Sequence, residues 1–312
     1  MIKIAYVLTG IQKPEYLNML RISIASAIRC MPAVKIEVVS DIETADHLVT
    51  NHVIAQENVT VVAEDVPKKY STVEKSRYLK TNLRRLVTGD FLYIDTDTII
   101  CDDLSDICPV SSVNLVLDEN CLLTEQEYCE MIRSKAAKVG IDLNECTHYF
   151  NGGVIFAKDD EKAHEFFRRW FEKWESTHTP KMPQDQFSLN AVNMEMGCIG
   201  ELDGTWNCQL TATDKALPYF RNVKILHYLS PHPYSIYRLN EIDLMRKELT
   251  ADEIQTIISA PEKLIRPFHY YADDSIEYQV MQGAQFHLAF RWYIKHPGLY
   301  NFFEKVLSIF RK

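Results

Sequence analysis

Short apolar runs alternate with helix-period segments across the first hundred residues, and this alternation restricts the fold more than any other feature. The apolar runs have the length and residue types of buried strands and lie at 2–8, 34–39, 59–63 and 91–94. The segments between them repeat apolar residues at helical spacing, at 15–29, 43–50 and 71–87. Strands that alternate with helices form a largely parallel sheet with helices on its faces. The sequence therefore predicts an α/β fold with a mixed, mostly parallel sheet flanked by helices.

The same pattern continues through the middle of the chain and then gives way to helices. Further strand-like runs lie at 113–117, 153–157 and 223–226, and helical patterns lie near 125–139 and 161–175. Beyond about residue 236 the patterns are helical only, near 240–258, 276–295 and 299–311. We therefore predict one large α/β domain over 1–235 and a helical C-terminal extension over 236–312.

The composition is that of a compact protein that acts on small molecules. A hydrophobic fraction of 46% allows 312 residues to bury a large core. The net charge of −9 argues against nucleic-acid binding, which needs a clustered basic surface. The eight cysteines include no C-x-x-C pair, and we read them as reduced thiols of a cytoplasmic protein. The apolar run at the N-terminus is too short for a spanning helix and is read as a strand.

Two aspartates stand at the end of a continuous apolar run. Residues 91–94 read as a strand buried on both faces, and Asp95, Thr96 and Asp97 follow directly. Ligands of open α/β sheets bind outside the carboxyl ends of the strands, so a site is expected here. Side chains two residues apart in extended chain point to the same side, where two carboxylates repel unless a cation lies between them. Their oxygen ligands suit Mg²⁺ or Mn²⁺.

Two other interpretations of this motif stay open. Solvated turn aspartates would bind nothing, and this is the only reading for Asp102 and Asp103 just downstream. Four apolar residues followed by D-x-D-x-T also open phosphatases of the haloacid-dehalogenase type, in which the first aspartate is a nucleophile. That family places the motif on its first strand, whereas three strand–helix units precede Asp95 here, and Asp273-Asp274 lacks the strand and glycine of its later acidic element. The phosphatase is the second candidate.

Four blocks follow one another in the chain: Lys75-Ser76-Arg77 through Asp95-Thr96-Asp97, then Tyr149 to Val154, Gln184-Asp185-Gln186, and Ile225 to Tyr228. In their order and spacing they resemble the retaining GT-A glycosyltransferases that include glycogenin and bacterial lipopolysaccharide galactosyltransferases. The resemblance covers about residues 1–230. It implies the GT-A fold, which is a Rossmann-like fold of nucleotide-diphospho-sugar transferases. The donor-binding half would be about 1–110 and the acceptor half about 111–235.

The resemblance implies a metal site that includes a histidine distant in sequence. In the family, the position of His227 completes the site formed by Asp95 and Asp97. A lone histidine is usually structural, but this one follows an apolar strand-like run, and imidazole beside oxygen ligands is reasonable for Mn²⁺. Mn²⁺, or Mg²⁺ in its place, is the expected cofactor.

The resemblance also implies contacts to the donor diphosphate. It places Arg77 against the donor, where a cation stabilises negative charge. Lys80 and Arg84 share the charged face of the same helix, and Lys80 is the second expected donor contact. A charged helix face is otherwise simply solvated.

Two further blocks are expected to contact the donor sugar. Gly152 and Gly153 allow close backbone approach, while Asn151 would bond sugar hydroxyls, although a tight turn explains the same residues. By resemblance Asp185 contacts the sugar and Gln186 lies near its reacting carbon, although Asp185 also suits a helix start. Trp206-Asn207 is read either as acceptor wall or as core.

The nucleoside is expected at the end of the first strand, where the base-contacting residues would be Tyr6, Leu8, Thr9 and Gly10. Asp95 and Thr96 of the acidic motif are further expected donor contacts. Many relatives carry acidic residues or Asn just past this strand, whereas the chain has Gly10-Ile11-Gln12-Lys13. Relatives also follow the histidine with a Gly-x-Lys-Pro-Trp-like block, and the chain has Ser230 to Tyr234 in its place.

The sequence as a whole predicts transfer of a hexose from a nucleotide-diphosphate sugar, by resemblance a UDP-hexose, to a glycan or glycolipid hydroxyl with retention. A sugar-nucleotide binder that has lost turnover is a third candidate. The terminal stretch 286–312 mixes aromatic and basic residues, which is typical of helices at anionic membrane surfaces and also of helices packed on a core. The first alternative predicts a cytoplasmic protein bound peripherally to the inner face of the membrane.

Overall fold

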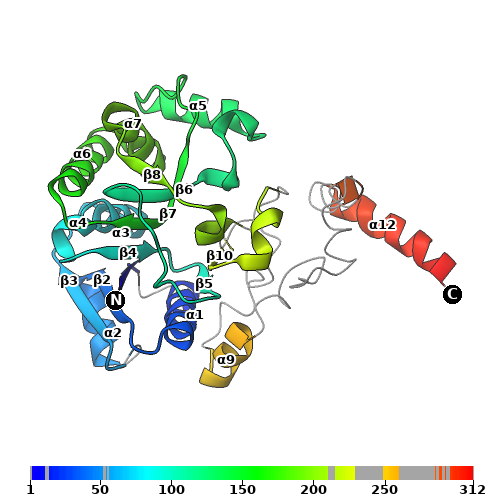
Figure 1. The fold of residues 1–312 in the computed structure, drawn as a ribbon, viewed down its shortest axis with the longest axis horizontal. Helices are drawn as coiled ribbons and strands as arrows, with labels where there is room; N and C mark the ends of the chain where they lie inside the picture. The colour runs from blue at the N-terminus through cyan, green and yellow to red at the C-terminus, as the bar shows by residue number, and fades with distance from the viewer. Residues whose placement is uncertain are drawn as a thin grey trace.

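The computed structural model describes residues 2–10, 14–51, 54, 56–209, 215–228, 249–259, 285, 288–289, 292 and 296–311. A seven-stranded sheet in the order β3-β2-β1-β4-β7-β6-β8 forms the centre of the described chain (Figure 1). Its strands are β1 (Lys3–Leu8), β2 (Lys35–Asp41), β3 (Val59–Glu64), β4 (Phe91–Ile94), β6 (Val113–Leu117), β7 (Phe150–Ala157) and β8 (Ile199–Glu201). Only β7 runs antiparallel to its neighbours, so the predicted mixed, mostly parallel sheet is confirmed.

A second, three-stranded sheet lies against the first. It consists of β5 (Thr98–Ile100), β9 (Cys208–Gln209) and β10 (Ile225–His227), in the order β5-β10-β9. Strand β5 begins directly after the acidic motif, and β10 pairs with it antiparallel. The smaller sheet therefore joins the motif to a segment more than a hundred residues further along the chain.

The helices occupy nearly the predicted positions. They are α1 (Pro14–Cys30), α2 (Ile42–Thr50), α3 (Thr72–Thr81), α4 (Leu83–Leu86), α5 (Cys129–Lys138), α6 (Glu161–Thr177), α7 (Gln186–Met196), α9 (Ala251–Ser259) and α12 (Pro297–Ser308), with 3₁₀ turns at Asp118–Asn120, Leu123–Glu125, Gly204–Asn207, Leu217–Asn222 and Ile309–Arg311. The helix predicted over 71–87 divides at Asn82, whose side chain donates to the carbonyl of Tyr78 at 2.8 Å. Ser71 caps α3 in a capping box with Glu74.

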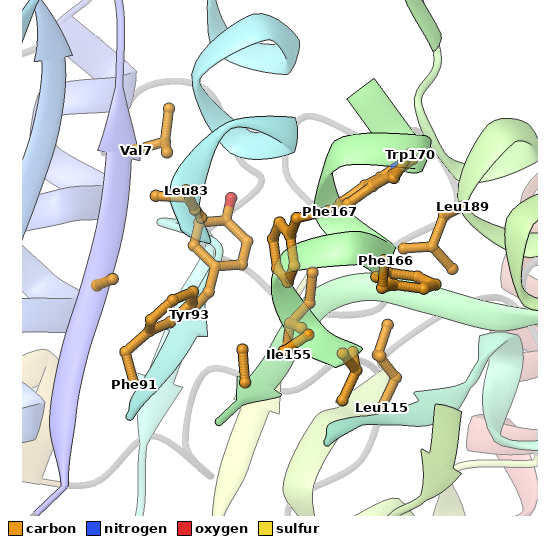
Figure 2. Packing of buried hydrophobic residues seen from close by; sticks show 14 of the residues in the cluster. Val7, Leu83, Phe91, Tyr93, Leu115, Ile155, Phe166, Phe167, Trp170 and Leu189 are labelled. Carbon is orange, nitrogen blue, oxygen red and sulfur yellow. The ribbon is translucent and has the colours of Figure 1, made fainter. Parts of the chain in front are cut away.

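Strands β1, β4, β6 and β7 of the central sheet are buried on both faces, which is why they read as continuous apolar runs, whereas the edge strand β3 is partly exposed. Alternate residues of one strand belong to different clusters: Phe91 and Tyr93 face α3, α6 and α7, whereas Leu92 and Ile94 face α1 and α2. Figure 2 shows the first cluster, in which aromatic side chains of α6 lie over the strands. The sheet is thus rigidly held between two layers of helices.

The two described helices of the C-terminal region differ in how they are packed. Helix α9 packs on α1 through Ile254, Ile257 and Ile258, which join Met19 and Ile22 in a buried cluster. Helix α12, at the red end of Figure 1, exposes large apolar side chains. No described helix is long and apolar enough to span a membrane. The predicted boundary at 235 and most of the helix predicted over 276–295 lie outside the described residues.

Candidate functional site

A cleft lies where the strand order of the central sheet reverses. Strands β1 and β4 are neighbours, although β2 and β3 separate them in the chain, and such a switch point leaves a crevice at the strand ends. The cleft has a volume of about 260 Å³. Of the predicted site residues, those that line it are Leu8, Thr9, Arg77, Asp95, Thr96 and Asp97. The switch point therefore collects most of the acidic motif and the predicted donor contacts of β1 and α3.

Asp95 is held from three directions. Its backbone N–H donates to the carbonyl of Gly153 at 2.7 Å, because β4 and β7 pair antiparallel just before it. The hydroxyl of Tyr93 donates to its carboxylate. The buried ammonium of Lys80 lies 3.2 Å from Oδ1 and 3.4 Å from Oδ2. These contacts fix the carboxylate and offset its charge.

His227 reaches Asp97 through strand pairing. In the antiparallel ladder of β5 and β10, His227 is the partner of Thr98, the residue that follows the motif. The backbone N–H of Tyr228 donates to the carbonyl of Asp97 at 3.1 Å. As a result Nε2 of His227 lies 3.3 Å from Oδ1 of Asp97. The structure thus brings together the three residues predicted to bind metal.

The three side chains fit a divalent cation. Each of Asp95, Asp97 and His227 offers one ligand atom, and these atoms lie within 4.8 Å of one another. Ligands about 2.1 Å from one octahedral ion are separated by roughly 3–4 Å, so small side-chain adjustments suffice. Two carboxylates and one imidazole suit Mn²⁺ or Mg²⁺. Among the described residues no second cluster of this kind occurs.

The electrostatics of the cluster reflect its charges. Burial alone would raise the pKa of Asp97, but the neighbouring imidazole of His227 holds it below its ordinary value. Burial would likewise lower the pKa of His227, and Asp97 reverses this effect and raises it. A cation that binds here therefore competes with the proton that the carboxylate of Asp97 helps the imidazole of His227 to hold.

Asp185 is positioned by the aromatic side of α6. The indole nitrogens of Trp170 and Trp174 donate to the carbonyls of Asp185 and Pro183, at 2.9 Å and 3.0 Å. Its carboxylate then lies 3.2 Å from Nε of Arg77 and 3.9 Å from Nζ of Lys80. Burial would lower the pKa of Arg77, but the carboxylate of Asp185 keeps it above its ordinary value. The three predicted residues therefore form one charged group.

Asp118 is a site residue that the sequence interpretation missed. It follows β6 directly and accepts a hydrogen bond from the side-chain nitrogen of Asn151 at 2.8 Å. It also forms a hydrogen bond with the side chain of Gln186. Burial raises its pKa above the ordinary value, although these hydrogen bonds oppose the rise. The rule that identified Asp95, an acid directly after a buried strand, would have found Asp118 too.

The residue after Asp118 has a strained backbone. Glu119 has φ of 52° and Asn120 of 55°, in the left-handed region that few residues other than glycine occupy. The N–H of Glu119 donates to the side-chain oxygen of Gln209 at 3.0 Å, while its own Oε2 is buried without a hydrogen bond among the described residues. Burial, with the nearby charge of Asp118, raises the pKa of Glu119 to about 7. Strain and an unpaired carboxyl at one turn mark it as a functional position.

The remaining predicted residues lie at varying distances from the cleft. Gly152 is packed beside the ammonium of Lys80. Gly10 has a φ of 85°, and its backbone N–H donates to the hydroxyl of Thr44. Tyr6 is fully buried with its hydroxyl on Ser23, and it is not among the residues that line the cleft. Its contact with a nucleoside stays a prediction.

A larger hollow of about 780 Å³ lies between α4 and α6 and contains none of the predicted site residues. Most of its cations already have carboxylate partners: Arg85 pairs with Glu64, and Arg168 with Glu165 and Glu172. We therefore locate the chemistry at the smaller cleft, where ligand-binding groups converge.

The sheet topology and the switch-point cluster define a transferase of the GT-A fold. The model of glycosyl transferase family 8 matches residues 8–232, and the chain belongs to this family. This membership favours the transferase over the phosphatase. A search among curated proteins finds no sequence match.

Solved structures agree with the fold. The galactosyltransferase LgtC, in complex with donor and acceptor sugar analogues, is 15% identical over 89% of this chain and 99% of its own, with a TM-score of 0.51. The glycosyltransferase GlyE of Streptococcus pneumoniae is 15% identical over 87% of this chain and 67% of its own, with a TM-score of 0.51. At these identities the likeness establishes the fold alone.

Gly153→Ala is expected to disrupt the metal site. A Cβ at this position would lie 2.4 Å from Cε1 of His227 and 2.8 Å from Oδ1 of Asn151, so the imidazole must move. We expect Mn²⁺ affinity, measured by electron paramagnetic resonance titration, to fall about 10- to 100-fold. Gly152→Ala is the matched control, since its Cβ would come no closer than 3.4 Å to the flexible end of Lys80. Equal losses in both variants would contradict the expectation.

Glu119→Gln is expected to stabilise the protein at high pH. An unfolded glutamate loses its proton near pH 4.3, whereas folded Glu119 keeps its proton up to about pH 7. Stability of the wild type should therefore fall between these values and stay reduced above them. The variant should gain about 1–2 kcal/mol at pH 8, after allowance for solvent screening, and nothing at pH 4. Urea unfolding measures this, with the exposed Glu145→Gln as control; a gain independent of pH would refute the assignment.

Proposed function

We propose that the protein transfers a hexose from a UDP-hexose to a hydroxyl of a glycan or glycolipid, with retention, in a metal-dependent reaction. The observation that carries this proposal is the cluster of Asp95, Asp97 and His227, in which the two aspartates line a switch-point cleft together with Arg77. Family membership supports sugar transfer from a nucleotide donor.

The chemistry we infer is assistance to the leaving group. Bound Mn²⁺ or Mg²⁺ would offset charge that develops on the departing nucleoside diphosphate. Arg77 adds a fixed positive charge in the same cleft, and Asp185 holds it in place. The block 230–234, where relatives carry a diphosphate-binding lysine, lies outside the described residues. We assign Lys80 to this task, because its ammonium lies within the cluster of acids.

The sugar would lie between Asp185 and Asp118. Oδ2 of Asp185 is buried and makes no hydrogen bond within the described chain, so it can accept one from a sugar hydroxyl. Gln186 lies beside Asp118, near the reacting carbon in our proposal, and an amide is a poor nucleophile. We therefore infer that the acceptor hydroxyl attacks from the face that the diphosphate leaves, without a covalent sugar–enzyme intermediate.

Metal-dependent release of nucleoside diphosphate tests this function. We would measure Mn²⁺-dependent hydrolysis and binding over a panel of nucleotide sugars, for the wild type and an Asp95→Asn, Asp97→Asn double variant. The wild type should release the diphosphate of one donor, and the double variant should lose at least about 100-fold of that rate. Asp102→Asn with Asp103→Asn is the matched control, since these exposed acids follow β5 and lie outside the cleft.

Each other outcome points elsewhere. Binding without release, even with acceptors present, would indicate a sugar-nucleotide binder that has lost turnover. Failure to bind any nucleotide sugar, together with release of phosphate from simple esters, would restore the phosphatase. A sugar trapped covalently on Asp185 would refute attack from the leaving-group face.

We propose further that α12 lies on an anionic membrane surface on the cytoplasmic side, where a lipid-linked acceptor would be found. Its exposed apolar side chains occupy one half of the helix at helical spacing, at Leu299, Phe302, Phe303, Val306 and Leu307, and Phe310 continues this face in the 3₁₀ turn that follows. Lys305 and Arg311 flank this face and suit anionic headgroups.

Deletion of residues 297–312 tests the membrane proposal. The full chain should sediment with phosphatidylglycerol vesicles, while the deletion variant should stay in the supernatant, because the deletion removes α12 and with it the apolar face that would contact lipid. Phosphatidylcholine vesicles are the control for charge. Both proteins should release nucleoside diphosphate equally from the soluble donor. Unchanged sedimentation of the deletion variant would refute this role of α12.

A further inference from the structure

His227 can bind a metal through Nε2 only if its proton lies on the other ring nitrogen. A neutral imidazole carries one N–H, and the tautomer depends on which neighbour accepts from it. In the structure Nε2 lies 3.3 Å from Asp97, and Nδ1 lies 2.9 Å from the side-chain oxygen of Asn207. The direction of the hydrogen bond between Nδ1 and Asn207 therefore affects whether Nε2 has a free lone pair for the metal.

The direction can be worked out from a backbone donor. The N–H of Gly153 can only donate, and it lies 2.8 Å from the side chain of Asn151, so the atom it meets must be the amide oxygen. The amide nitrogen of Asn151 then faces the carboxylate of Asp118 at 2.8 Å, which can accept it. Both ends of Asn151 are thereby assigned by chemistry.

The orientation of the Asn151 amide also determines the orientation of the Asn207 side chain. Its side chain lies 3.0 Å from the amide oxygen of Asn151, and two oxygens at that distance would repel, so the nitrogen of Asn207 must be the donor. The oxygen of Asn207 is thus turned toward Nδ1 of His227, and only a protonated Nδ1 can complete the contact. One backbone amide, acting through two asparagines, therefore places an acceptor at Nδ1, which competes with the carboxylate of Asp97 at Nε2 for the proton of a neutral ring.

The relay is also rigid and dry. Asn207 and His227 are almost fully buried, which leaves no access for bulk water. The carbonyl of Asn207 accepts from the side chain of Asn120 at 2.9 Å, and Asn120 in turn accepts from the backbone of Gln209 at 3.0 Å. Such burial places Asn207 inside the protein, away from the acceptor wall that the sequence also suggested.

We propose that Asn207, oriented by Asn151, is a positioning residue that keeps His227 in the Nδ1–H tautomer and leaves Nε2 for the metal. Outer hydrogen bonds of this kind typically change metal affinity by about 10- to 100-fold. The inference rests on the proposed metal-binding role of His227, but the tautomer exists in the metal-free protein and can be measured there.

Nitrogen NMR of metal-free protein labelled with ¹⁵N-histidine tests the relay. A His227→Gln variant identifies the signals, and the spectrum is taken at a pH where the ring is neutral. Wild type should show a protonated Nδ1. Asn207→Leu removes the acceptor and should move the proton to Nε2, with Mn²⁺ affinity reduced about 10- to 100-fold. Asn207→Asp loses the N–H that faces the oxygen of Asn151, but it keeps an acceptor for Nδ1–H and should therefore retain the wild-type tautomer.

The outcomes separate a relay from a merely structural role. A wild-type ring protonated on Nε2 would overturn the proposal by itself, even if the Leu variant did not fold. A folded Asn207→Leu that keeps Nδ1–H, or a folded Asp variant that carries the proton on Nε2, would also overturn it. A protein with the Nδ1–H tautomer that transfers no sugar would refute the proposed function and leave the relay intact.

Discussion

The repulsion between the carboxylates of Asp95 and Asp97 is the constraint on which the rest of the site depends. Both follow a strand buried on its two faces, so neither is fully hydrated, and each needs a compensating partner. Asp95 receives Lys80 and the hydroxyl of Tyr93, and Asp97 receives His227. These partners belong to α3, β4 and β10. Compensation of two charges therefore ties a helix and the second sheet to the first sheet.

The sequence predicted what depends on local pattern. The alternation of strands and helices predicted the parallel part of the sheet. The rule that ligands bind at the carboxyl ends of parallel strands then identified Asp95. The sequence did not predict β5 and β9, because two or three residues show no period. It also left Asn207 ambiguous, since the partner that gives this amide its direction lies 56 residues away. Tertiary hydrogen bonds of this kind leave no local signal.

The polar interior of the site is continuous. Asp118, beside the proposed sugar position, connects through Asn151 and Asn207 to His227 and so to Asp97. A buried network stabilises the fold only when all of its members are satisfied, because an unpaired polar group in a low dielectric is costly. Replacement of any member should thus be felt at both ends, where sugar and metal are proposed to bind.

The pairing of β5 with β10 affects the order in which parts of the protein can fold. Residues 98–100 must wait for residues 225–227 before the smaller sheet can close. During synthesis from the N-terminus, the larger sheet can begin to assemble while β5 still lacks its main-chain partner. Contacts this distant in sequence form slowly, because a long loop must close first. The newborn chain therefore carries an incomplete candidate cation site until residues 225–227 emerge and pair with β5.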